Sequence, residues 1–116
     1  MKTTILTVPL KGRGVFAKTP IPKKSLIEVC HLLIMKINEV PDALEGYVFE
    51  YDKKHSALAL GNGSLYNHSD QSNAWVEMED KTRLLYIYAK RVIRPGEEVT
   101  IDYSYSTANR LKFGIV

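Results

Sequence analysis

Three short segments carry residue types that could bind a small polar ligand. The first contains Gly12, Arg13 and Gly14, where two glycines around one residue allow a ligand to approach the backbone closely. The pattern is not a dinucleotide fingerprint, because it lacks a third glycine and a following helix. Taken alone, this segment predicts a tight hairpin turn.

The second segment spans residues 65–73 and is rich in Asn, Ser and His. Asn67 can donate and accept hydrogen bonds at once, and neutral His68 can do the same. Such a loop suits a ligand that carries both an amine and acceptor nitrogens, although an exposed Asn-rich loop explains the pattern equally well. A zinc site is not indicated, because the three histidines lack ligand spacing and the chain has one cysteine.

The third segment spans residues 95–103 and ends in a tyrosine. Strand alternation places Tyr103 on the same face as Val99 and Ile101, so its hydroxyl is carried among apolar neighbours. That hydroxyl either serves a reaction or finds a backbone carbonyl. On this segment alone, a packed tyrosine is the simpler interpretation.

The elements that must position these segments are predicted to be mostly β. The apolar runs are short, rich in β-branched and aromatic residues, and separated by turn signals. A loop with two prolines is expected at 20–24 and a helical turn at 41–45. The predicted strands of the first half are 3–8, 15–17, 25–35, 47–51 and 57–60.

The second half predicts a hairpin followed by one more strand. Val76 and Met78 alternate with polar neighbours up to a turn at 79–81, and alternation resumes on the return strand. The alternating apolar residues of that return strand are Leu84, Tyr86 and Tyr88. A Pro-Gly turn at 94–97 then leads into a strand over 99–103.

Length and composition predict a single globular domain over residues 1–116. The hydrophobic share is 45% and the charged share 25%, as in ordinary folded domains. No apolar run approaches the ~18–20 residues that span a bilayer, and the start lacks a secretory signal. With one cysteine, an intracellular, reducing location is expected.

The net charge of +3 makes the chain mildly basic. The basic pairs Lys23-Lys24, Lys53-Lys54 and Arg91/Arg94 are scattered along the sequence, whereas a nucleic-acid interface usually concentrates its cations. The pattern therefore favours solvated loops and strand edges, and direct nucleic-acid binding is not expected.

The three segments occur along the chain in the same order as the motifs of the SET domain, which they resemble. The SET domain defines a family of protein lysine methyltransferases. Gly12-Arg13-Gly14 is similar to its first motif, and residues 47–52 are similar to the Y-x-F-x-x-D segment of several histone H3 methyltransferases. Residues 66–73 resemble R-F-x-N-H-x-x-x-P-N, and residues 98–103 resemble E-L-x-F-D-Y. Ser72 replaces the usual proline, Ile101 a common aromatic and Ser104 a common glycine. Because it lacks cysteine-rich flanking segments, the sequence most resembles the minimal stand-alone viral members of the family.

The resemblance implies a fold and a chemistry. The fold would be small β-sheets around a C-terminal pseudoknot, with short helical turns only and no zinc-binding flanking modules. The reaction would be in-line methyl transfer from S-adenosyl-L-methionine to a deprotonated lysine amine of a histone tail, with H3 as the expected substrate. The nucleus is then the expected location, and the cytoplasm otherwise. The viral members also imply a homodimer.

The resemblance also assigns residue roles. Tyr103 would be catalytic, and the lysine channel would be formed by Tyr47, Ile101 and Tyr103. Because isoleucine has no hydroxyl and is smaller than an aromatic residue, the channel is expected to admit di- or trimethyl-lysine. The cofactor would be held by Gly12, Arg13, Gly14, Asn67, His68 and Tyr103, with Tyr105 and Phe113 covering the adenine.

Acidic side chains at Glu28, Glu45, Glu50 and Asp52 could attract a basic tail, although simple solvation also explains each of them. Two other classes of function stay open. One is a SET-like module that holds a peptide without turnover. The other is a small basic β-barrel that stacks single-stranded nucleic acid on its tyrosines. The joint presence of Asn67, His68 and Tyr103 favours the enzyme.

Overall fold

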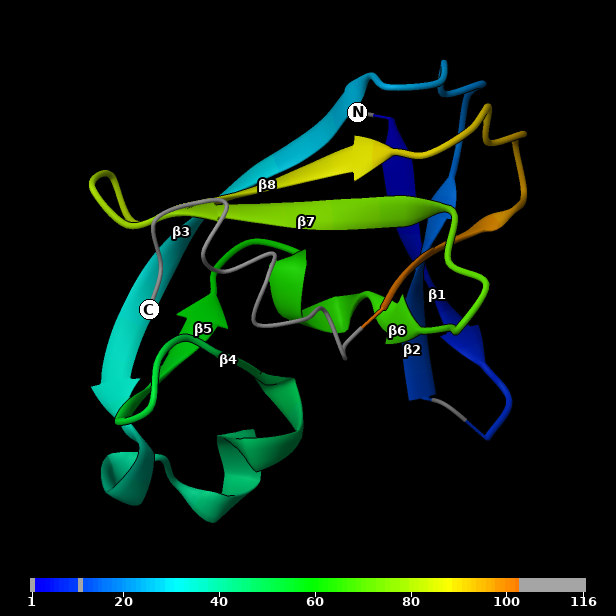
Figure 1. Cartoon of the computed structure of the whole chain (residues 1–116). Helices are drawn as coiled ribbons and strands as arrows, with labels where there is room; N and C mark the ends of the chain where they lie inside the picture. The colour runs from blue at the N-terminus through cyan, green and yellow to red at the C-terminus, as the bar shows by residue number, and fades with distance from the viewer. Residues whose placement is uncertain (1, 11, 103–116) are drawn as a thin grey trace.

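The computed structural model describes residues 2–10 and 12–102, which form two β-sheets and three 3-10 helices (Figure 1). One sheet has the order β1-β2-β9-β6 and consists of β1 (Thr3–Val8), β2 (Gly12–Ala17), β9 (Glu98–Ile101) and β6 (Asn67–His68). The other has the order β4-β5-β3-β8-β7 and consists of β4 (Val48–Glu50), β5 (His55–Ala59), β3 (Leu26–Lys36), β8 (Leu84–Ala89) and β7 (Ala74–Glu79).

The 3-10 helices are η1 (Ile37–Glu39), η2 (Asp42–Tyr47) and η3 (Gly63–Leu65). The predicted mostly-β fold with short helical turns is therefore confirmed for the described residues. The predicted helical turn at 41–45 is η2, and it extends to Tyr47, so the strand expected from residue 47 begins one residue later. None of the helices in the described residues is long and apolar enough to cross a bilayer.

The turn of the first hairpin lies before the two glycines, and not at them as the sequence predicted. Gly12 and Gly14 pair with Val8 and Leu6, so both lie within β2 and the chain reverses before them. Leu10 in that reversal has φ 68° and Gly12 has φ 83°, which are the left-handed conformations that close the hairpin. The prediction was wrong because a pair of glycines is found in turns and also where other groups pack closely against the backbone. Gly14 is of the second kind, since neighbouring side chains pack closely against it.

The predicted second hairpin is confirmed as β7 and β8, but its buried face differs. Val76 lies opposite Ile87 and Met78 opposite Leu85, and all four side chains are buried. The alternating residues Leu84, Tyr86 and Tyr88 therefore occupy the half-buried face, where the Tyr88 ring stacks on Trp75 with a centroid distance of 5.1 Å. Because every residue of β8 is apolar or aromatic, alternation of type could not identify the inner face.

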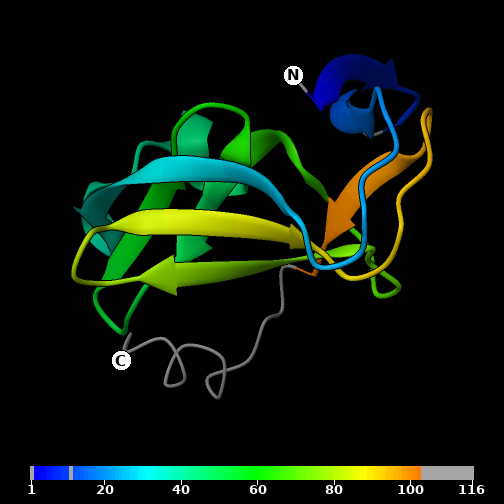
Figure 2. The same cartoon turned by 90° about the horizontal axis from the view of Figure 1, so that it is seen from above.

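The β1–β2 hairpin stands at one end of the layer formed by β3, β8 and β7, as the view from above shows (Figure 2). The strand β9 pairs antiparallel with β2 (Val15 opposite Val99) and parallel with β6 (Asn67 opposite Thr100). A parallel pair requires a crossover, and here the β7–β8 hairpin supplies it. The predicted C-terminal threading involves residues from 103 onward, outside the described residues.

Candidate functional site

The three predicted motif segments meet where β2, β6 and β9 lie side by side. The Asn67 amide nitrogen donates to the Arg13 carbonyl at 3.0 Å, across 54 residues of sequence, and to the Glu98 carboxylate at 2.7 Å. One side chain of β6 thus joins the Gly-Arg-Gly segment to the C-terminal segment. The tertiary fold therefore brings together the predicted residues Gly12, Arg13, Gly14 and Asn67.

Gly14 is buried at the centre of this contact. A Cβ built on it would lie 2.6 Å from Oε2 of Glu98, 3.0 Å from Nδ2 of Asn67 and 3.0 Å from a Val8 methyl group. Only glycine leaves room for the Glu98–Asn67 hydrogen bond in its present place. At Gly12, by contrast, a Cβ would meet nothing within 4 Å, and only its φ of +83° favours glycine.

His68 follows Asn67 on β6 and is flanked by two carboxylates. Its Nε2 lies 3.0 Å from Oδ1 of Asp70, and its Nδ1 lies 3.6 Å from Oδ1 of Asp102. The ring is half-buried, so one edge still reaches solvent. These contacts hold the imidazole in one orientation beside the β6–β9 pair, which suits a role in binding.

The second asparagine of the same segment is structural. Asn73 is 3% exposed, and its side chain donates to the Glu98 carbonyl at 2.8 Å and accepts from the Thr100 amide at 2.9 Å. The Ser69 amide also donates to the Ile101 carbonyl at 3.0 Å. The Ser69 bond extends the pairing of β9 with β6, and the two Asn73 bonds hold β9 beside the start of β7.

The predicted lysine channel is only partly described. Ile101 is fully buried on β9, as alternation with its polar neighbours predicts. Tyr47 is 44% exposed and lines a hollow of about 280 Å³ with Glu45, Glu50 and Ser64 among other residues, a lining that does not include Ile101. Tyr103, Tyr105 and Phe113 lie outside the described residues, so their predicted roles stay predictions.

Sequence analysis missed three carboxylates of this site. Glu98 accepts from Asn67, while Asp70 and Asp102 flank His68. Two of the three were detectable, because Glu98 in β9 and Asp102 directly after it alternate with the buried residues Val99 and Ile101 and so lie on the polar side. Asp70 follows His68 by two residues in a loop, where no periodic signal exists.

Glu28, predicted as a possible attractor of a basic tail, is engaged inside the protein. Its carboxylate accepts from the Tyr66 hydroxyl at 2.7 Å, the Asn62 amide at 3.0 Å and the Cys30 thiol at 3.3 Å. Burial, and then the charge of Glu28, raises the pKa of Cys30 to about 12 and also raises the pKa of Tyr66. Cys30 therefore stays a thiol at neutral pH and is not a nucleophile.

No group of three or more His, Cys, Asp or Glu side chains within residues 2–10 and 12–102 is arranged to hold a metal ion. The geometry is instead that of a polar binding site built from backbone carbonyls, an amide, an imidazole and carboxylates. Such groups bind a ligand that carries hydrogen-bond donors.

Comparison with known proteins identifies relatives of this chain. The SET domain family model matches residues 12–104. A histone-lysine N-methyltransferase of Schizosaccharomyces pombe, H3 lysine-37 specific, is 33% identical over 98 residues, which are 80% of this chain and 67% of that protein. An H3 lysine-36 specific histone-lysine N-methyltransferase of Candida albicans is 31% identical over 124 residues, which cover 89% of this chain but only 14% of that protein.

The fold has a solved counterpart as well. The crystal structure of a candidate histone methyltransferase from Plasmodium falciparum superimposes with a TM-score of 0.78 at 35% identity, covering 92% of this chain and 96% of that chain. The family match spans all four segments in which sequence motifs were found, including those that meet where β2, β9 and β6 lie side by side. The chain therefore belongs to the SET-domain family of methyltransferases.

Proposed function

We propose that this protein transfers methyl groups from S-adenosyl-L-methionine to a lysine of a histone tail, with H3 as the first candidate substrate. The observation that carries the proposal is the meeting of Gly14, Asn67 and Glu98 from three separate segments. It is supported by the 33% identity to the H3 lysine-37 specific enzyme.

The polar groups of Arg13, Asn67 and Glu98 suit the amino-acid end of this cofactor. S-adenosyl-L-methionine, when bound, supplies an activated methyl group on a sulfonium. Its ammonium group needs acceptors, and the site offers the Arg13 carbonyl and the Glu98 carboxylate. The Asn67 amide nitrogen already serves these two acceptors, which leaves its carbonyl oxygen to accept from the ammonium. We assign the adenine to His68, with Tyr105 and Phe113 as its cover.

The lysine must lose its proton before transfer, and the protein assists by desolvation. The free pKa of a lysine amine is ~10.4, and an apolar wall lowers it because burial disfavours the charged form. Ile101 is fully buried and provides such a wall. We assign to Tyr103 the role of orienting the amine through its hydroxyl, and to Tyr47 the outer part of the channel. No strong general base is required on this scheme.

Charge on the surface favours a basic substrate. Residues 37–52 contain five carboxylates and neither Lys nor Arg, a formal charge of −5. Glu45 and Glu50 border the same hollow of about 280 Å³ as Tyr47. The segment is bordered by Lys36, Lys53 and Lys54, and Lys36 pairs with Glu39 at 3.9 Å. The carboxylates inside the segment still outnumber these cations, and an excess of one sign attracts a polycation. We name this segment the acidic end and propose that it receives the histone tail.

The proposal is tested by incubating the full chain with separated core histones and radiolabelled cofactor, followed by mass spectrometry of the labelled peptide. We expect label on H3. Asn67→Ala should abolish the increase in melting temperature that the cofactor produces by binding only the folded state. A thermal shift without any label on histones would contradict the enzyme and favour the non-catalytic peptide-binding module.

Two further variants test the residue roles. Tyr103→Phe removes only a hydroxyl and should lower turnover by orders of magnitude while cofactor affinity changes little. Ile101→Tyr should return the product from di- or trimethyl-lysine to monomethyl-lysine. A wild-type reaction that stops at one methyl group would contradict the assignment of Ile101 while leaving the methyltransferase intact.

We also propose that the protein acts as a homodimer in the nucleus. The dimer follows from the resemblance to the minimal viral members, and the nucleus from a chromatin substrate. Light scattering coupled to size exclusion distinguishes a dimer from a monomer of 13.2 kDa. A monomer mass at working concentration would remove the dimer from the proposal without affecting the chemistry.

A further inference from the structure

Two loops that are far apart in the sequence run side by side at one end of the molecule. Ile21 and Ile93 exchange backbone hydrogen bonds of 2.8 and 2.9 Å. On either side of this bridge, the Gly96 amide donates to the Ala17 carbonyl at 2.8 Å, and the Lys24 amide donates to the Ala89 carbonyl at 2.8 Å. Because Ile21 and Ile93 are fully buried, the two loops are anchored from inside.

The exposed side chains of these loops are strongly basic. Residues 18–24 and 90–97 contain six cations and a single carboxylate, a formal charge of +5, whereas the whole chain carries +3. We name this surface the basic end. All six cations are exposed, and they are Lys18, Lys23, Lys24, Lys90, Arg91 and Arg94.

Two of the three basic pairs that are scattered along the sequence are therefore brought together by the fold. The fold places Lys23-Lys24 and Arg91/Arg94 on the same pair of loops, while Lys53-Lys54 lies apart, between β4 and β5. The acidic end and the basic end lie at opposite ends of the molecule, at the lower left and upper right of Figure 1.

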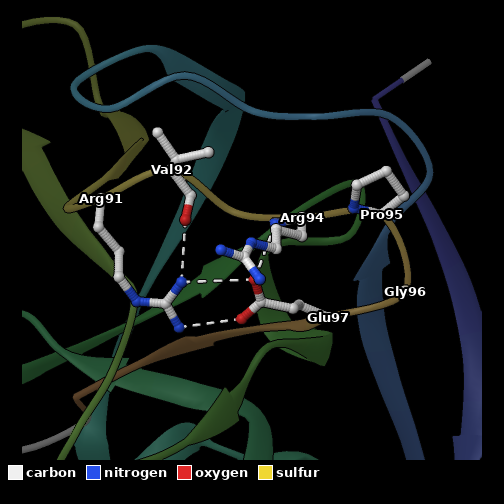
Figure 3. Close-up of a pocket in the computed structure, with 6 residues that line it drawn as sticks. All are labelled: Arg91, Val92, Arg94, Pro95, Gly96 and Glu97. Carbon is white, nitrogen blue, oxygen red and sulfur yellow. Dashed lines mark hydrogen bonds and ion pairs between the residues drawn. The ribbon is translucent and has the colours of Figure 1, made fainter.

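The single carboxylate of the basic end orders the loop and leaves the surface positive. Arg91 Nη2 donates to Glu97 Oε2 at 3.0 Å, and the Arg94 amide donates to Glu97 Oε1 at 2.8 Å (Figure 3). Arg91 also donates to the Val92 carbonyl at 2.9 Å. An open hollow of about 920 Å³ lies over this turn. Pro20, Pro22 and Pro95 further restrict the two loops, so the cations stand on a preformed backbone.

The chemistry of this surface selects one kind of polyanion. Exposed Lys and Arg side chains on loops bind phosphate groups and carry no sequence information. Residues 18–24 and 90–97 contain no aromatic side chain, so they offer no platform on which the bases of a single strand could stack. We propose that the basic end binds the phosphate backbone of duplex DNA without sequence preference, so that DNA is held at one end of the molecule while the acidic end faces a basic tail.

The DNA contact goes beyond the proposed methyl transfer and does not depend on it. Fluorescence anisotropy with a labelled duplex of mixed sequence measures the contact, using the full chain at low salt and then at increasing salt. If about five cations neutralise phosphates, the logarithm of the affinity falls with the logarithm of salt at a slope of roughly −4.5.

The test variant is Lys23→Glu with Lys24→Glu, and the matched control is Lys53→Glu with Lys54→Glu, which changes the net charge equally. We expect the test variant to weaken duplex binding at least about tenfold and to flatten the salt slope by about two, and the control to change affinity by less than about twofold. Lys18→Gln with Arg94→Gln is a second variant on the same surface, for use if the first does not keep the melting temperature of the wild type.

Equal weakening by the test and control variants would overturn the proposal, because net charge alone would then explain binding. Tighter binding of single-stranded RNA or polyglutamate than of the duplex would also overturn it, in favour of another polyanion. Methylation of a free histone peptide should be unchanged in the test variant, while methylation of nucleosomes should fall. A variant that loses duplex binding but methylates the peptide normally separates this inference from the proposed function.

Discussion

The acidic end and the basic end differ in how the chain builds them. The acidic end is one continuous stretch, residues 37–52, whose charge of −5 is visible in the sequence. The basic end consists of two loops, and its charge of +5 exists only because Ile21 and Ile93 pair across the fold. A charged surface formed by one continuous segment can be predicted from the sequence. One formed by two segments that pair only in the folded protein cannot.

The two ends also differ in packing. Neither η1 nor η2 has a buried residue, and the Ile37 amide donates to the Lys54 carbonyl at 2.9 Å. The acidic end reaches the core only through Phe49 and Tyr51, which follow the two helices. The basic end is held by two fully buried isoleucines. Segments with few buried apolar contacts open at low free-energy cost. Residues 37–47 of the acidic end are therefore suited to adapt to a peptide, and the basic end to present a fixed set of cations.

The largest predicted effect lies outside both ends, at the contact of Gly14, Asn67 and Glu98. Gly14→Ala should push the Glu98 carboxylate away from Asn67 and lower methyl transfer on any substrate by about 100-fold, the scale expected for a misplacement of about 1 Å. Lys81→Ala, at the exposed turn between β7 and β8, is the control, because it lies outside the motif segments and outside the acidic end. Steady-state kinetics on a histone peptide measures both, and equal losses would refute the role of close contact at Gly14.

Charge reversal at the acidic end should have the next largest effect. Glu45→Lys with Glu50→Lys should raise the KM for a histone peptide by about tenfold, with kcat nearly unchanged, because a complementary field acts on encounter and binding. Duplex DNA binding should not weaken in this variant. Glu79→Lys, at the far turn of β7 and β8, is the control and should leave KM within about twofold. An unchanged KM in the double variant would show that the acidic end does not receive the tail.

A combined variant tests whether the two ends act independently. Joining Glu45→Lys and Glu50→Lys with Lys23→Glu and Lys24→Glu should give effects on nucleosome methylation that add in free energy to within about 0.5 kcal/mol, since distant sites without shared partners are additive. The measurement is kcat/KM on nucleosomes for the wild type, the two double variants and the combination. A larger deviation would mean that the ends are energetically coupled.

The smallest predicted effect is a pH dependence that both ends share. A side-chain hydrogen bond from Arg91 lowers the pKa of Glu97. Desolvation acts to raise the pKa of Asp52, but hydrogen bonds from the Lys54 and His55 amides and the His55 ring outweigh it and lower that pKa. A lowered pKa contributes stability that is present above the unfolded pKa and lost as the pH falls through the folded pKa.

Glu97→Gln should therefore lower the melting temperature at neutral pH, by about 2–4 °C for a solvent-screened pair worth about 0.5 kcal/mol. The difference should shrink as the pH falls below the ordinary value of 4.5 and through the lowered folded pKa. Asp52→Asn should behave in the same direction at the acidic end. Melting curves recorded from neutral to acidic pH check both variants, and a difference that grows on acidification would contradict the assignment.

The sequence by itself determined the strands and the segments that carry chemistry. Alternation predicted the β7–β8 hairpin and the burial of Ile101, and Pro41 with the following acidic residues predicted η2. These are local properties, because the side-chain period of a strand and the turn preference of a residue depend on near neighbours. The motif residues Gly14 and Asn67 were found for the same reason, as short patterns in the chain.

Tertiary structure alone decided what those residues contact. Glu28 resembled a surface charge in the sequence, but the fold engages it with Tyr66, which is 1% exposed. Glu98 contacts Asn67 only because β9 inserts between β2 and β6, and the order of strands in a sheet depends on long-range pairing rather than on any local pattern. The basic end arises in the same way: side-chain charges are written in the sequence, but which of them become neighbours is decided by the pairing of buried residues such as Ile21 and Ile93.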